Sequence, residues 1–171
     1  MKRSKKNWPI DAGIDIKVSS HQVWQLMTSP TKVRLYHPFV KNYTTIGAWG
    51  GMGSQDQITY NSGASFDRKV TGWFEGTGYD LNVADDKGNE LVVTWRIREK
   101  DEDNCRLEIS VVATSIEKLP LPIRWFVIRY KLKPVFSSYL AAALQGFRYY
   151  AENGIPVRKN QFGFHPIFSP E

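Results

Sequence analysis

The sequence has a single cysteine, Cys105, among 171 residues, and it has no long hydrophobic run. One cysteine cannot form an internal disulfide, which excludes a disulfide-stapled secreted scaffold. The longest apolar stretch, around Trp125 to Ile128, is far too short to span a bilayer. A signal peptide requires an apolar run after its basic start. The basic start MKRSKKNWPIDAG is followed by no such run. We therefore expect a cytoplasmic protein.

The sequence also lacks the compact motifs of many enzyme classes. It has no nucleophile elbow, and the glycines of GAWGGMG open no helix, so they do not form a phosphate or dinucleotide loop. His21, His37 and His165 have no Cys, Asp or Glu at metal-ligand spacing. We predict no metal site and no cofactor, and we assign no catalytic residue.

Acidic and basic residues are nearly balanced outside the first few positions. The formal net charge is +6, and much of the excess comes from Lys2, Arg3, Lys5 and Lys6. Without them the body is only mildly basic, which argues against a nucleic-acid-binding surface.

We assign residues 1–11 to a basic tail, 12–154 to one domain and 155–171 to a surface tail. We expect three aromatic residues to pin that last tail: Phe162, Phe164 and Phe168.

Alternating apolar and polar residues predict seven short strands with one buried face each. These segments are residues 14–18, 43–49, 54–60, 66–74, 79–83, 91–98 and 106–115. Turn residues between them predict sequential hairpins and therefore an antiparallel sheet. In the last strand Cys105 alternates with Leu107, Ile109 and Val111, which favours a buried, inert thiol over a reactive one.

Three segments have helical signals. SSHQVWQLM, capped by Ser19 or Ser20, predicts a short helix, and a second short helix runs from Thr31 to the step at Pro38. Apolar residues at helical spacing predict a long helix from Pro134 to Glu152. Only this helix is long enough to cover the apolar face of the sheet. The predicted fold is α+β, a seven-stranded antiparallel sheet wrapped around a long C-terminal helix, with two short helices after the first strand.

This order of elements is that of the helix-grip fold. The segments IDIKVSSHQVWQLMTSPTKVRLYHPFV and LAAALQGFRYYAENG resemble the opening and the terminal helix of the START-like (SRPBCC) superfamily, which includes polyketide cyclase/dehydrase-type proteins, pollen-allergen-type proteins and lipid-transfer START domains. The resemblance covers residues 12–154. It implies a cavity between sheet and helix that holds apolar or amphipathic ligands. It carries over no catalytic residue, because the superfamily has no universal one.

Several residues are candidates for the walls of such a cavity. The candidate ligand-binding residues are His37, Tyr60, Arg68, Tyr79, Trp95, Ala143 and Phe147. Phe66 and Phe74 are further candidates for the wall. Each aromatic side chain can instead fill the core. Small residues in the middle of the long helix either leave space for a ligand or allow close packing. They are Ala141, Ala142, Ala143 and Gly146.

Arg68 and His37 could bring polar chemistry to the cavity. If Phe66 and Val70 face inward, Arg68 does too, and its charge then needs a buried partner or a ligand carboxylate or phenolate. A frame shift of one residue instead places Arg68 in water, and we favour this interpretation. His37 ends the second short helix, where the superfamily has its cavity mouth. It could act as an acid or base, but we favour a structural role.

The segment from Ile123 to Lys133 combines basic and aromatic residues. Such a segment can make transient contact with a membrane surface. We favour the alternative, an amphipathic lid or a first helical turn packed on the sheet.

Three functions fit these observations. The leading hypothesis is the binding of a hydrophobic or amphipathic small molecule, such as a lipid, a quinone or a polyketide-like compound. The alternative is a cyclase/dehydrase-type enzyme in which His37, Arg68 or Tyr60 orients an enolate and moves protons. The second alternative is a protein- or ribosome-binding module that uses the outer face of the sheet. The sequence indicates no oligomeric state.

Overall fold

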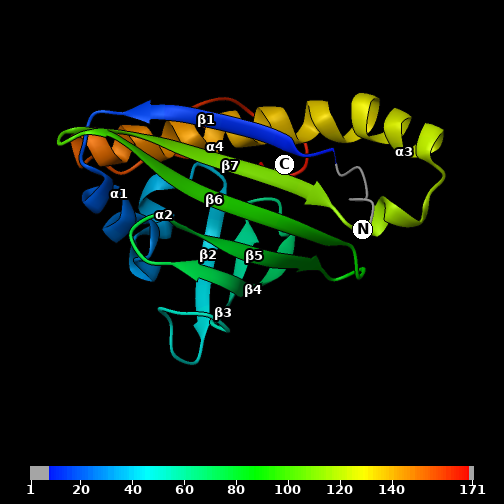
Figure 1. The fold of residues 1–171 in the computed structure, drawn as a ribbon, viewed down its shortest axis with the longest axis horizontal. Coiled ribbons are helices and arrows are strands. Elements are labelled where there is room, and N and C mark those ends of the chain that lie inside the picture. Colours follow the sequence, from blue (N-terminus) through cyan, green and yellow to red (C-terminus); the bar gives the residue numbers. More distant parts are fainter. Residues whose placement is uncertain (1–7, 170–171) are drawn as a thin grey trace, which may run out of the picture.

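The computed structural model describes residues 8–169, and it confirms the predicted helix-grip architecture (Figure 1). One antiparallel sheet of seven strands has the order β1-β7-β6-β5-β4-β3-β2. The strands are β1 (Ile10–Ile16), β2 (Val40–Ile46), β3 (Gln55–Tyr60), β4 (Ser65–Phe74), β5 (Gly78–Asp85), β6 (Glu90–Asp101) and β7 (Asn104–Ala113). Consecutive strands from β2 to β7 are neighbours, as sequential hairpins require. The sheet curves around the longest helix, which lies behind it in this view.

The first two strands differ most from the prediction. β1 begins at Ile10 rather than Ile14 and enters the segment assigned to the tail, because Ile10 is buried opposite Val111 of β7. Gly13 interrupts the apolar pattern there and lies under the guanidinium of Arg106. β2 covers residues 40–46 rather than 43–49, and Trp49 lies beyond it. The basic residues of the predicted tail lie outside the described residues, and the predicted domain boundaries stay a prediction.

The helices are α1 (Ser20–Met27), η1 (Pro30–Lys32), α2 (Val33–Tyr36), η2 (Ser115–Lys118), α3 (Leu121–Val127), η3 (Ile128–Leu132) and α4 (Lys133–Asn153). The Ser19 side chain caps α1, and Gln22 completes a capping box, as the sequence predicts. At the other end of the chain, Gly154 ends α4 with a left-handed φ of 68°, a conformation that glycine adopts without steric cost. No helix in the described part of the chain is long and apolar enough to cross a membrane.

The helical segment that precedes the C-terminal helix is longer than predicted. α4 begins one residue before Pro134, but η3 is a π-helical turn that joins it to α3. Proline cannot donate a backbone N–H and crowds the carbonyl four residues earlier, so a locally wider turn accommodates it. The expectation that this segment packs on the sheet holds for one side only, where Arg124 and Ile128 share a depression with Val112 and Ala113 at the end of β7. Trp125 and Phe126 are exposed, because α3 extends past the end of the sheet (Figure 1).

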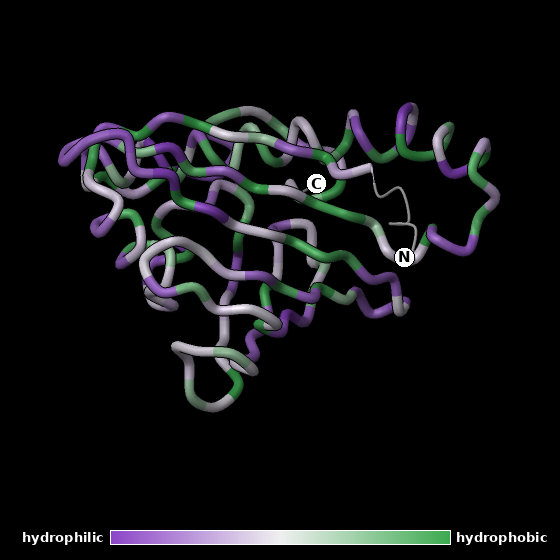
Figure 2. Tube along the Cα trace, viewed as in Figure 1, coloured by the Kyte–Doolittle hydropathy of each residue, from purple (hydrophilic) through white to green (hydrophobic). Residues whose placement is uncertain are grey.

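The core lies between the concave face of the sheet and α4. Residues of alternating hydropathy follow the strands in Figure 2, and the inward set of β7 is buried as predicted. Cys105 belongs to that set and is free and buried. Gly146 of α4 lies against the connection after α2, where an added Cβ would be 2.4 Å from the Tyr36 carbonyl oxygen. At this position the small residue serves close packing rather than a cavity.

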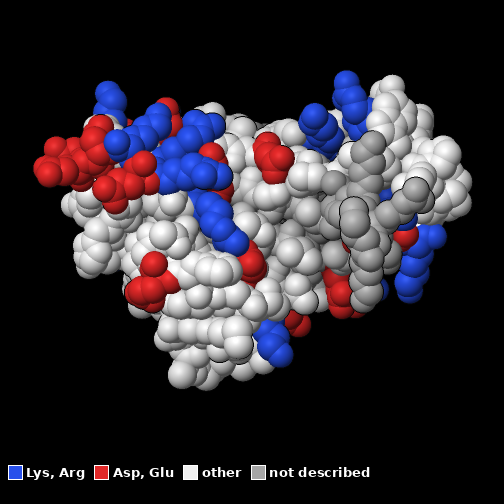
Figure 3. Space-filling model, in the orientation of Figure 1, with Lys and Arg blue, Asp and Glu red and all other residues white. Residues whose placement is uncertain are grey.

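The outer face of the sheet is charged, as the alternation predicts. Arg98 Nε is 2.6 Å from Glu108 Oε2, and Arg106 Nη1 is 3.0 Å from Asp15 Oδ1. Figure 3 shows these charges of both signs gathered on the sheet surface near one end. These charges weigh against the protein-binding hypothesis, which an exposed apolar patch on this face would favour.

The C-terminal segment after α4 returns across the molecule and is held by two buried residues. Phe168 is buried, and His165 Nε2 lies 3.0 Å from the Val135 carbonyl oxygen on α4. Phe162 is half-buried, whereas Phe164 is exposed. Two of the three predicted aromatic anchors therefore contact the body, and the third does not.

Candidate functional site

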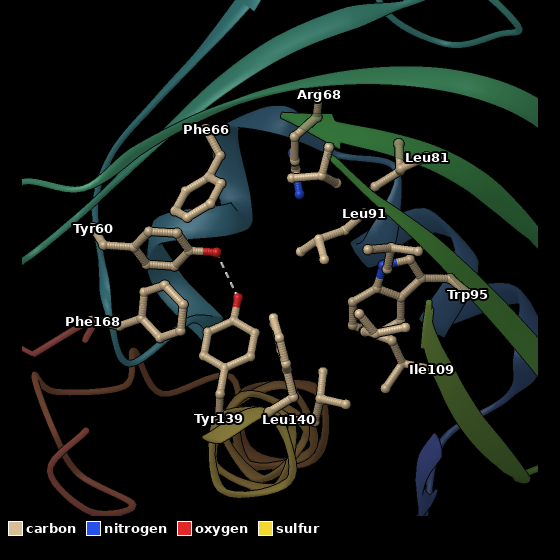
Figure 4. Close-up of a pocket in the computed structure, with 14 residues that line it drawn as sticks. Tyr60, Phe66, Arg68, Leu81, Leu91, Trp95, Ile109, Tyr139, Leu140 and Phe168 are labelled. Carbon is tan, nitrogen blue, oxygen red and sulfur yellow. Dashed lines mark hydrogen bonds between the residues drawn. The ribbon is translucent and has the colours of Figure 1, made fainter. Parts of the chain in front are cut away.

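Two cavities lie between the sheet and α4. The larger, drawn in Figure 4, has a volume of about 90 Å³ and is largely apolar. The smaller has a volume of about 50 Å³. Both have Arg68, Trp95 and Tyr139 in their walls, so these three side chains separate them. An apolar cavity of roughly 150 Å³ holds a benzene molecule, so the two volumes together approach the space for one aromatic ring.

The walls come from elements far apart in the sequence. The larger cavity is lined by Tyr60, Phe66, Arg68, Leu81, Val83, Leu91, Val93, Trp95, Ile109, Val111, Phe136, Tyr139, Leu140 and Phe168. The smaller cavity is lined by Met27, Val33, Tyr36, His37, Tyr43, Trp49, Ile58, Arg68, Tyr79, Trp95, Tyr139, Ala143 and Phe147. Each of the seven candidate ligand-binding residues lies on at least one of these walls. Their role in ligand binding stays a prediction.

One expectation about the walls is wrong, and the alternatives left open for the small residues of α4 are now decided. Phe74 is 46% exposed, because the turn at Gly76 follows it directly and its ring lies over the Arg96 guanidinium on the outer face. Of the small residues on α4, only Ala143 lines a cavity. Ala142 is buried against the cluster that contains Phe39, and the side chain at 141 is exposed.

Arg68 faces inward, contrary to the interpretation that we favoured. β4 pairs with β3 in a register that sets Arg68 opposite Asp56. Arg68 Nε and Nη2 donate to the two oxygens of Asp56, at 2.6 and 2.9 Å. Tyr43 also donates to this carboxylate, at 2.7 Å. Burial disfavours the guanidinium cation, but the charge of Asp56 and its hydrogen bonds outweigh this, so the pKa of Arg68 is raised.

A chain of hydrogen bonds connects His37 to the larger cavity. His37 Nε2 lies 3.0 Å from the Tyr139 hydroxyl, which lies 2.7 Å from the Tyr60 hydroxyl (Figure 4). The Phe39 backbone N–H donates to His37 Nδ1. In a neutral imidazole the other nitrogen then carries the proton, so Nε2 donates to Tyr139. Either phenol can be the donor in the bond between them. We assign Tyr139 as the donor to Tyr60, because this continues the chain of donors from His37, and the Tyr60 proton then points elsewhere.

Burial sets the protonation of these groups. It disfavours the imidazolium form of His37, and together with the nearby Arg68 charge it lowers the pKa of His37 to about 3. Burial also raises the pKa of Tyr139 and of Tyr60. At neutral pH the histidine is therefore uncharged and both phenols keep their protons. Groups in these states can donate and accept hydrogen bonds, but His37 is a weak base.

Two hydrogen-bond donors remain available to the larger cavity. The Tyr60 hydroxyl accepts from Tyr139, and the described part of the chain offers its proton no acceptor. Arg68 Nη1 likewise bonds to none of residues 8–169, and 16% of the Arg68 side chain is exposed. Both residues line the larger cavity, where Figure 4 shows them reaching toward the same space. The site can therefore offer two donors to an acceptor inside an apolar enclosure.

The sequence reasoning missed Asp56 and Tyr139. Asp56 alternates with Ile58 and Tyr60 along β3, and this pattern alone predicts an inward carboxylate that needs a cationic partner. Tyr139 lies four residues before Ala143, on the same side of α4. Phe168 left no such signal, because the segment that carries it has no periodicity.

Comparisons with known proteins agree with this architecture. The model of the family described as polyketide cyclase / dehydrase and lipid transport matches residues 8–152. DynU16, a protein of the dynemicin biosynthetic locus, superposes with a TM-score of 0.61 at 15% identity over 86% of this chain; the chain spans only 48% of DynU16. Norcoclaurine synthase from Thalictrum flavum, in complex with dopamine and hydroxybenzaldehyde, gives 0.61 at 14% identity, covering 84% of this chain and 85% of that one. Ara h 8.0201 gives 0.64 at 11% identity, covering 84% and 97%.

At these identities the solved structures show a shared fold and nothing finer. None of the curated proteins matches the sequence significantly. The family model, in contrast, covers the sheet and nearly all of α4, which together enclose the two cavities. The chain therefore belongs to the polyketide cyclase / dehydrase and lipid transport family.

Proposed function

We propose that this protein binds a hydrophobic small molecule that carries a neutral hydrogen-bond acceptor, such as a ketone or quinone carbonyl. The observation that carries the proposal is the larger cavity, an apolar enclosure in which Tyr60 and Arg68 each keep a free donor. Ligand sites are usually apolar with a few polar groups that orient the ligand. A carbonyl oxygen has two lone pairs and could accept from both residues.

The charge balance favours a neutral acceptor over a carboxylate. The carboxylate of Asp56 already neutralises Arg68 at 2.6 Å. A ligand carboxylate would enter this enclosure without an unpaired cation to meet it, and a buried, uncompensated charge is strongly unfavourable. Norcoclaurine synthase, whose structure has been solved with hydroxybenzaldehyde, takes an aromatic carbonyl compound on the same fold. That relative supports the ligand class proposed for this chain.

The size of the cavity limits what can bind without rearrangement. Sites for drug-sized ligands measure about 300–1,000 Å³, whereas the larger cavity measures about 90 Å³. Phe168 lies on its wall, with its ring 4.4 Å from that of Tyr60 and 4.5 Å from that of Tyr139. Even a ligand with one aromatic ring would need to displace this side chain or one of the three that separate the cavities.

The binding proposal can be tested by calorimetric titration with three compounds of one size: acetophenone, ethylbenzene and benzoate. We expect acetophenone to bind most tightly, because only it offers a neutral acceptor. Tyr60→Phe should weaken acetophenone binding about three- to tenfold, the value of one hydrogen bond, and leave ethylbenzene unchanged. Tyr130→Phe, on the exposed surface, is the matched control. Equal binding of the ketone and the hydrocarbon would contradict the proposed role of Tyr60 and Arg68.

A cyclase/dehydrase-type reaction is the second candidate, because two donors at a carbonyl oxygen also stabilise an enolate. His37 is the histidine of this network, but its pKa of about 3 makes it a weak base at neutral pH. Solvent deuterium exchange at the methyl group of bound acetophenone, followed by NMR, separates the two functions. Exchange at the rate of the free ketone supports a carrier, and protein-accelerated exchange that Tyr60→Phe abolishes supports an enzyme.

A further inference from the structure

The segment before α4 presents an exposed apolar surface that no part of the proposed binding site uses. Five large side chains of α3 and η3 are each between 48% and 58% exposed: Leu121, Ile123, Trp125, Phe126 and Tyr130. We call this set the apolar helix face. It lies on the helix that extends past the end of the sheet in Figure 1, and hydrophobic and hydrophilic residues are interspersed along that helix in Figure 2. Exposed apolar groups gathered in this way mark interaction sites.

The aromatic members of this face form one continuous cluster. The Tyr130 ring lies 5.0 Å from the Phe126 ring and 5.9 Å from the Trp125 ring. The guanidinium of Arg129 lies 5.7 Å from the centre of the Tyr130 ring. The cluster therefore combines large amphipathic rings with an adjacent cation.

The opposite side of the same helix is anchored to the body. Val127, Ile128 and Leu132 are half-buried, and Arg124 Nη2 donates to the carbonyl oxygens of Leu119 and Glu117. The helix therefore packs one apolar side against the body and leaves the side chains of the apolar helix face in solvent. These contacts with the body hold the helix in position while the apolar helix face stays exposed.

The segment that carries the apolar helix face has side-chain charges of one sign. From Lys118 to Ala151 the sequence contains no Asp or Glu. Arg129, Lys131 and Lys133 are exposed on η3 and the start of α4.

We propose that the apolar helix face binds the surface of an anionic lipid bilayer. Trp and Tyr are the residues that favour the membrane interface, and Lys and Arg near it are attracted to anionic headgroups. A second copy of this chain fits less well. A twofold contact through the same face would bring two sets of basic residues together, and residues 118–151 supply no acidic side chain to oppose them.

The apolar helix face lies near one end of the larger cavity, so membrane contact there could serve ligand uptake. Phe136, Tyr139 and Leu140 line the larger cavity and lie only one to three helical turns beyond Tyr130. A bilayer bound at the apolar helix face would therefore lie close to one end of the ligand cavity. The membrane proposal does not depend on the ligand proposal, because the exposed residues of α3 do not line either cavity.

Flotation with lipid vesicles tests the proposal on the full chain. The vesicles contain either phosphatidylcholine with phosphatidylserine or phosphatidylcholine alone. We expect the protein to float with the anionic vesicles, and to do so less at high salt. The double variant Trp125→Glu with Phe126→Glu should weaken binding by more than about tenfold, since two apolar rings no longer enter the interface. Lys131→Glu with Lys133→Glu should weaken it about fivefold or more for each cation removed.

The control is a double variant at two other exposed apolar positions, Phe164→Glu with Ile167→Glu, which should float like the wild type. Circular dichroism establishes that every variant is folded. Absence of flotation with anionic vesicles at low salt would overturn the proposal, and so would unchanged flotation of the Trp125 and Phe126 variant. A stable dimer in analytical ultracentrifugation that this variant abolishes, without vesicle binding, would assign the face to self-association instead.

Discussion

Removing the carboxylate of Asp56 tests the buried ion pair between the two cavities. The Asp56 side chain is 0% exposed, and it accepts two hydrogen bonds from Arg68 and one from Tyr43. Asp56→Ala leaves the Arg68 cation in the core without a partner, which costs about 3–5 kcal/mol of unfolding free energy. A domain of this size loses about 2–4 °C for each kcal/mol. We therefore expect the melting temperature to fall by about 6–20 °C.

A double-mutant cycle separates the pair from its surroundings. Arg68→Met alone leaves the Asp56 carboxylate buried, whereas the double variant removes both charges and should recover about 3 kcal/mol relative to the sum of the single variants. Urea unfolding measures each free energy. The exposed pair Arg98 and Glu108, whose closest atoms are also 2.6 Å apart, is the matched control. Its coupling should stay below about 1 kcal/mol. Additive effects at Asp56 and Arg68 would refute the reasoning.

Three further predictions concern stability and reactivity. Because His37 has a folded pKa of about 3 and an unfolded value near 6.5, the unfolded chain binds more protons between these values, so stability should fall as the pH drops from about 6.5 toward 3. Urea unfolding of His37→Gln should show a weaker pH dependence than the wild type in this window, and His21→Gln, on the surface, should not. Gly146→Ala should lower the melting temperature, since its Cβ would lie 2.4 Å from a backbone carbonyl oxygen, with a cost of about 1–3 kcal/mol; an unchanged melting temperature would contradict this close packing. The Cys105 thiol, whose pKa burial raises to about 11, should react with a thiol reagent only as fast as the protein unfolds.

Periodicity predicted the fold because each strand has one buried face. The alternation of Leu107, Ile109 and Val111 placed β7 correctly, and all three are buried. The same rule was set aside at Arg68, where we gave more weight to the cost of a buried charge than to the alternation with Val70. The pattern was right, because Asp56 on the neighbouring strand compensates that cost.

Features that depend on contacts between distant segments could not be read from local patterns. Phe168 closes one side of the larger cavity from a segment without periodicity, and its position follows from packing against Tyr60 and Tyr139. The outward turn of Trp125 also escaped prediction. Its helix reads as amphipathic in the sequence, but no pattern indicates that the sheet ends before the helix does.

Native mass spectrometry of the purified protein tests the central claim, that the larger cavity holds a hydrophobic ligand, most directly. Val93 of β6 lines this cavity, whereas Val92 faces outward beside the exposed Asn82. Val93→Phe fills part of the cavity with a ring, and Val92→Phe places the same ring on the outer face. We predict a bound small molecule, or added acetophenone, on the wild type and on Val92→Phe, with binding lost in Val93→Phe. Equal occupancy of a folded Val93→Phe variant, or failure of the wild type to bind any of these compounds, would contradict the claim.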